Sequence, residues 1–108
     1  MTEIKRNTRK IDRYTVETFS KEIVSACLLK VEAGTNGYQG GDSGHGSRTY
    51  ISFEDQGGTD IRVQVEGLHN DADKITLVFG GDCELSSIIK ALKFVVNVLE
   101  DQIKGNED

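Results

Sequence analysis

The 108-residue sequence contains no proline and no tryptophan, and only two cysteines and one methionine. Without proline, turns have to be located from glycine and from clusters of asparagine and aspartate. Cys27 and Cys83 match no metal-binding spacing, so we expect two reduced, buried thiols. No apolar run approaches the roughly 18 residues of a membrane span, and the polar N-terminus does not resemble a secretory signal. These absences predict a cytoplasmic protein with no membrane partner.

Basic charge is scarce outside the N-terminus. The chain has 18 acidic and 13 basic residues, and residues 1–13 contain five of the basic ones, Lys5, Arg6, Arg9, Lys10 and Arg13. Nucleic-acid binding needs Lys and Arg against phosphate, so we do not expect the acidic remainder to bind nucleic acid. We interpret residues 1–13 as a flexible basic arm. The alternative is an arm that docks on nucleic acid or on the acidic body of a neighbouring subunit.

Four segments are predicted to be β-strands, mainly because apolar and polar residues alternate with a period of two. These segments are residues 26–33, 48–54, 60–67 and 74–79. Turns are predicted at residues 55–58 and 69–73, which are rich in Gly, Asn and Asp. Residues 14–25 fit either a short helix or a strand.

A long amphipathic helix is predicted to follow Gly80-Gly81. Asp82 is the expected N-cap, and Glu84 places negative charge in the first turn. Apolar residues then recur at intervals of three and four through Ile103, and Lys104-Gly105 is the expected end. The predicted fold is α+β: an antiparallel meander of about four strands with this helix on one face. Residues 14–104 are predicted to form one domain, and residues 105–108 a frayed tail.

A glycine-rich segment separates the first two predicted strands. Six of the twelve glycines lie between Ala33 and Tyr50, together with hydroxyl, imidazole and guanidinium groups. Closely spaced glycines let backbone N–H groups converge on an anion. We expect Arg48, His45 and Ser43 to contact phosphate or sugar, and an aromatic ring to stack on the ligand. The candidate ligand-binding residues are Tyr38, Gly40, Gly41, Asp42, Ser43, Gly44, His45, Gly46, Ser47, Arg48 and Tyr50.

Other interpretations of the segment stay open. Its glycines also suit a wide hairpin loop with no ligand, and the pattern is not the GxxxxGK[ST] phosphate loop of nucleotide hydrolases. Arg48 has an alternative role as the ion-pair partner of Glu54, Asp55 or Glu66. Asp42 and His45, with His69 or Asp60, are a possible metal-binding or acid–base set.

The segment EAGTNGYQGGDSGHGSRTY, with the GGD that precedes the helix, resembles small uncharacterised proteins of Gram-positive bacteria and their phages or mobile elements. The resemblance covers about residues 26–100. It implies no catalytic residues and no activity. In its small size and its glycine-rich segment, the chain is also similar in general design to the sponge proteins that sequester cyclic-nucleotide or cyclic ADP-ribose signals of bacterial defence.

The sequence therefore predicts a non-enzymatic, homo-oligomeric protein without a cofactor. Residues 34–48 would sequester a small anionic molecule of the cyclic-nucleotide or ADP-ribose type. One alternative is a protein–protein interaction module or inhibitor with no small-molecule ligand. A third is a small metal-dependent hydrolase that uses Asp42 and His45.

Overall fold

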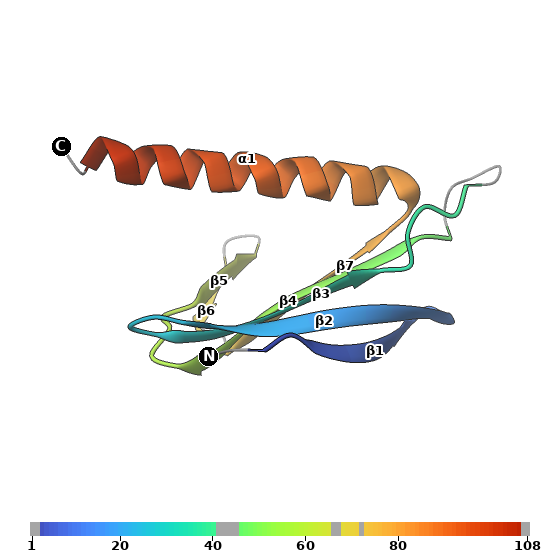
Figure 1. Cartoon of the computed structure of the whole chain (residues 1–108), viewed down its shortest axis with the longest axis horizontal. Coiled ribbons are helices and arrows are strands. Elements are labelled where there is room, and N and C mark those ends of the chain that lie inside the picture. The colour runs from blue at the N-terminus through green and yellow to red at the C-terminus, as the bar shows by residue number, and fades with distance from the viewer. Residues whose placement is uncertain (1–2, 41–45, 66–67, 72, 107–108) are drawn as a thin grey trace.

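The structure is a computed structural model that describes residues 3–40, 46–65, 68–71 and 73–106. Its main body is an open antiparallel sheet with one long C-terminal helix (Figure 1). In chain order the elements are β1 (Lys5–Ile11), β2 (Tyr14–Val24), β3 (Leu28–Thr35), β4 (Arg48–Gly57), β5 (Arg62–Val65), β6 (Leu68–Asp71), β7 (Lys74–Gly80) and α1 (Asp82–Asn106). The predicted α+β class is confirmed.

The main sheet has five strands in the order β1-β2-β3-β4-β7, and every neighbouring pair is antiparallel. The strand predicted over residues 60–67 does not join this sheet. It contains β5, which pairs with β6 in a separate two-stranded sheet. Most of β6 lies in residues 69–73, which were predicted to be a turn. The alternation within residues 60–67 correctly predicted a strand. It did not predict which strand this one pairs with, because pairing depends on the rest of the chain.

The N-terminal segment supplies an edge strand where a flexible arm was expected. β1 pairs with β2 along its whole length, so residues 14–25 are also largely strand. A two-residue turn joins the two strands, with positive φ at Asp12 (49°) and Arg13 (80°). Positive φ at both turn residues matches the twist of the hairpin. Backbone hydrogen bonds to β2 therefore order residues 5–11, whose basic and polar composition had predicted a flexible terminus.

The two faces of the sheet differ in composition. The polar face, defined here by the register, presents Arg9, Val16, Thr18, Glu32, Tyr50 and Ser52. The apolar face presents Phe19, Val31, Ile51, Phe53, Leu77 and Phe79. Val16 and Thr18 are 0% exposed and Glu32 is 2% exposed, so the polar face contains most of the buried strand residues.

Helix α1 begins where the Leu85 N–H donates to the Gly81 carbonyl, 3.1 Å away. Gly81 (φ 126°) therefore occupies the cap position predicted for Asp82, which is the first helical residue. The helix contacts β4 and β7, and Leu85 is buried there. Further along, α1 extends away from the strands (Figure 1). No helix among the described residues is both long and apolar enough to span a membrane.

The molecule is extended for its length. Its radius of gyration is 16.0 Å, against about 13 Å for a compact domain of this size. The buried apolar residues of the described part are Val16, Tyr50, Ile51 and Leu85. The helix and the apolar face of the sheet are thus joined at one end rather than packed along their length.

Candidate functional site

Asn36 closes the base of the glycine-rich loop. Its side-chain amide donates to the Gly46 carbonyl at 3.1 Å, and its amide oxygen accepts the Arg48 N–H at 2.7 Å. The Asn36 N–H also donates to the Arg48 carbonyl at 3.2 Å. A single side chain thereby links the outgoing and returning strands. The sequence analysis did not assign a role to Asn36, although asparagine is a common side-chain bridge in turns.

Asp82 ties the loop to the helix. Its carboxylate accepts the Gln39 N–H at 3.0 Å and the Gly40 N–H at 2.9 Å. The Gly81 N–H donates to the Ser47 carbonyl at 2.8 Å on the returning side. A carboxylate in the first helical turn is favoured by the helix dipole. The Gly40 N–H, which was expected to meet an anionic ligand, thus meets an anion of the protein itself.

Arg48 is held on the polar face beside the β1–β2 turn. Its Nε donates to Asp12 Oδ2 at 3.0 Å, and its Nη1 donates to the Ser47 carbonyl at 2.8 Å. The guanidinium carbon lies 4.8 Å from the centre of the Tyr14 ring. Asp12 is thus an acidic partner of Arg48, and it was not among the candidates from the sequence. Asp12 was missed because residues 1–13 were not expected to pair with the body of the protein.

The remaining predicted site residues that the structure describes differ in their exposure. Tyr38 is 62% exposed, whereas Tyr50 is 7% exposed and lies on the polar face of β4. Gly46 is half-buried beside the Gln39 side chain. Ser47 is fully buried, and within the described residues its Oγ has no hydrogen-bond partner. Gly41, Asp42, Ser43, Gly44 and His45 lie outside the described residues.

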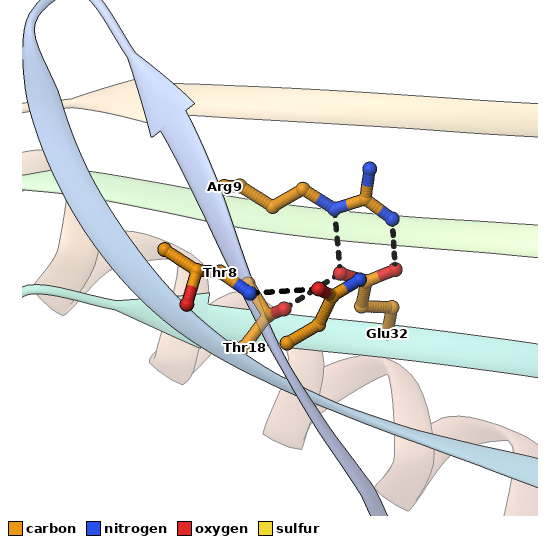
Figure 2. A network of polar contacts seen from close by, with 5 residues as sticks. Thr8, Arg9, Thr18 and Glu32 are labelled. Atoms are coloured by element: carbon orange, nitrogen blue, oxygen red, sulfur yellow. Dashed lines mark hydrogen bonds and ion pairs between the residues drawn. The ribbon is translucent and has the colours of Figure 1, made fainter.

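A polar network that was not predicted from the sequence joins Arg9, Thr18 and Glu32 (Figure 2). Arg9 extends from β1 to Glu32 on β3 and forms a bidentate pair: Nε to Oε2 at 2.8 Å and Nη2 to Oε1 at 2.6 Å. The Thr18 hydroxyl donates to Glu32 Oε2 at 2.6 Å. The Arg9 guanidinium carbon also lies 5.1 Å from the centre of the Tyr50 ring. This arrangement covers the polar face over three strands.

Glu32 is held in its charged form. The hydrogen bonds from Arg9 lower the pKa of the Glu32 carboxyl to about 2, against the opposing effect of burial, and the Thr18 hydroxyl lowers it further. The hydrogen bond to Glu32 raises the pKa of Arg9 above its ordinary value. A general acid at neutral pH needs a raised carboxyl pKa, so this pair is suited to holding strands together. One feature of the sequence indicated where Glu32 lies: the alternation of residues 26–33 predicted that its side chain is on the other face of the strand from Leu29 and Val31.

Metal and thiol chemistry find little support in the part of the chain that the structure describes. Within that part, no group of three or more His, Cys, Asp or Glu residues is placed to hold a metal ion. The Asp42 and His45 of the hydrolase hypothesis lie outside it. Both cysteines are free, but neither is buried: Cys27 is half-buried and Cys83 is exposed. Cys83 lies in the first turn of α1.

An open, mainly apolar groove follows the start of α1. It measures about 350 Å³ and is lined by Phe79, Cys83, Glu84, Ser87, Ile88 and Ala91. Comparison with protein-family models, with curated proteins and with solved structures finds no match for this chain. The function is therefore argued from the geometry alone.

Proposed function

We propose that the protein is a non-enzymatic protein–protein interaction module that binds through the apolar side of α1 and the adjoining apolar face of the sheet. The observation that carries this proposal is the exposure of both surfaces. Leu92, Val96 and Leu99 on α1 are 39%, 50% and 55% exposed. Phe19 and Leu77 on the sheet are 47% and 43% exposed. Contiguous exposed apolar surface of this kind is typical of protein-binding sites.

The polar groups support a structural role more than a catalytic one. Arg9 and Glu32 form two hydrogen bonds with each other, and the Asp82 carboxylate accepts hydrogen bonds from two N–H groups of the loop. Catalytic carboxyl groups usually have pKa values near the working pH, whereas that of Glu32 is about 2. The arrangement favours a rigid platform that presents an apolar surface.

The test is site-specific photo-crosslinking in the cell that produces the protein. A photoreactive phenylalanine analogue replaces Leu99 on the apolar side of α1, or Phe94 as the control. Phe94 is also apolar and is 67% exposed, but it lies about 160° around the helix from Leu92. We expect protein adducts from position 99 and none from position 94. Absence of adducts at position 99, or equal adducts at both positions, would contradict the proposal.

A second candidate function is the binding of a small anionic ligand of the cyclic-nucleotide or ADP-ribose type at the loop. The specific observation in its favour is Ser47, whose buried Oγ has no hydrogen-bond partner among the described residues, while its backbone carbonyl accepts a hydrogen bond from Arg48 Nη1. A buried hydroxyl without a partner is uncommon, and a ligand oxygen would satisfy it.

Thermal denaturation with a panel of linear and cyclic nucleotides tests this second function. A ligand at about a hundred times its Kd stabilises the folded state by about 2.7 kcal/mol. Arg48→Ala should abolish the ligand-induced shift, measured against the variant's own melting temperature. Arg62→Ala is the control, because Arg62 is exposed and pairs locally with Asp60. No shift with any nucleotide, or a shift that survives Arg48→Ala, would contradict the assignment.

A further inference from the structure

The exposed apolar side of α1 has a regular seven-residue pattern. The spacing Leu85, Ile89, Leu92, Val96, Leu99, Ile103 alternates steps of four and three residues. This is the spacing of the two core positions of a coiled coil. Along this row Leu85 is 5% exposed, Ile89 and Leu92 are 42% and 39% exposed, and Ile103, where the helix has left the sheet, is 58% exposed. The row from Ile89 onward is therefore an apolar surface that the described part of the chain leaves exposed.

We propose that α1 of a second copy covers this surface, with the two helices antiparallel about a two-fold axis close to Asn97. The inference rests on the proposed function and names its partner. In this arrangement Leu92 meets Ile103 of the second copy, and Val96 meets Leu99 of the second copy. Each of these two contacts occurs twice, because the two-fold axis exchanges the copies. The pair therefore buries four apolar layers.

The charges beside the row select the antiparallel direction. Lys93 and Glu100 occupy the same flank, seven residues or about 10.5 Å apart along the helix. In an antiparallel pair each flank faces the same flank of the partner, so Lys93 of each copy faces Glu100 of the other. The opposite flank carries Ile88 and Val95, which extend the apolar contact. In a parallel pair Lys93 would face this apolar flank and lose the ion pair.

The apolar side of α1 is exposed in every folded molecule, which favours a second copy as its partner over a protein that binds only occasionally. Within the part of the chain whose burial the structure describes, four buried apolar residues are a small core, and a chain of this size normally buries about two thirds of its unfolded surface. Whatever covers α1 therefore has to be present whenever the chain is folded. Another copy of the same chain meets that condition without any further component.

Sedimentation equilibrium over a range of concentrations tests the pairing. The chain has a mass of 11.9 kDa, and we expect a species of twice that mass. Leu99→Lys should weaken association roughly a hundred-fold, because it buries a charge in a central layer. Phe94→Lys, on the far side of the helix, should leave the dissociation constant unchanged. Far-UV circular dichroism establishes that each variant keeps its helix.

Charge reversal tests the direction of the pair without disturbing its apolar layers. Lys93→Glu and Glu100→Lys should each raise the dissociation constant by about ten-fold, and the double variant should restore it. Failure of the double variant to restore association, or an equal effect of Leu99→Lys and Phe94→Lys, would overturn the proposal. A monomer whose position 99 still gives adducts with another protein refutes the pairing and keeps the proposed function. A monomer that gives no adducts there refutes both.

Discussion

The two faces of the five-stranded sheet are buried to different extents, although Ile51 on the apolar face is only 7% exposed. On the polar face Val16 and Thr18 are 0% exposed, whereas on the apolar face Phe19 and Leu77 are 47% and 43% exposed. Composition alone would predict the reverse. The polar face is closed within the chain because Arg9 extends from β1 to Glu32 on β3. The apolar face depends on a covering helix, and the main strand contacts of α1 within the described residues are with β4 and β7, at one end of the sheet.

The largest expected effect on this comparison is at Gly34, which lies directly against the β2 backbone and is the register partner of Thr18. A Cβ at Gly34 would lie 2.7 Å from Thr18 Cα and would also overlap the Glu17 carbonyl oxygen. Gly34→Ala should therefore destabilise the fold by about 3 kcal/mol or more, measured by urea denaturation. Gly57→Ala is the control, because a Cβ there meets nothing within 4 Å. Equal losses in both variants would contradict the close approach.

Removal of the Glu32 carboxylate should open the polar face. Glu32→Ala leaves Arg9 and Thr18 without their acceptor, and we expect a loss of about 3 kcal/mol in unfolding free energy. Arg6 and Glu17 form an ion pair between β1 and β2, but on the exposed side of the sheet. Glu17→Ala should cost less than about 1 kcal/mol. A loss at Glu17 as large as that at Glu32 would remove the distinction between the two faces.

Acid should weaken the polar face through the same carboxylate. The pKa of Glu32 is about 2 in the folded protein, below the ordinary value of 4.5. Its stabilisation is fully present above pH 4.5 and is lost as the pH falls toward 2, a loss on the order of 2–3 kcal/mol. The stability difference between the wild type and Glu32→Gln should therefore shrink with acidification. A constant difference between pH 7 and pH 2.5 would contradict the lowered pKa.

Matched truncations compare the faces directly. Val16→Ala, at 0% exposure, should cost about 2 kcal/mol. Leu77→Ala removes more carbon but starts from 43% exposure, and should cost about 1 kcal/mol. The comparison is made at low protein concentration by urea denaturation. A larger loss at Leu77 would mean that the apolar face is closed in solution.

The smallest expected effect is a gain, in the hairpin that carries Arg9. Arg13 has φ of 80°, a region that strains residues with a Cβ. Arg13→Gly should raise the unfolding free energy by about 0.5–1 kcal/mol. Arg13→Ala keeps the Cβ and should leave stability nearly unchanged. Stabilisation by alanine as large as that by glycine would assign the gain to the lost charge instead.

Local patterns in the sequence predicted much of the fold and little of the site. The helix from Asp82 and the strands β3, β4 and β7 were predicted because each has a periodicity that depends on its own residues. β1 was not, because a basic segment with no alternation becomes a strand only when β2 lies beside it. Among the loop residues, Arg48 was recognised as important but not its partner Asp12. No local pattern indicated the pairing of Arg9 with Glu32, 23 residues apart.

The sequence by itself determined the α+β class, the long amphipathic helix and the row from Leu85 to Ile103, since periodicity is a property of consecutive residues. Only the tertiary structure decided which face of the sheet is closed, where Arg9 and Arg48 find their carboxylates, and how far α1 follows the strands. These outcomes depend on the distances between segments far apart in the chain. Strand pairing and packing set those distances, and composition does not.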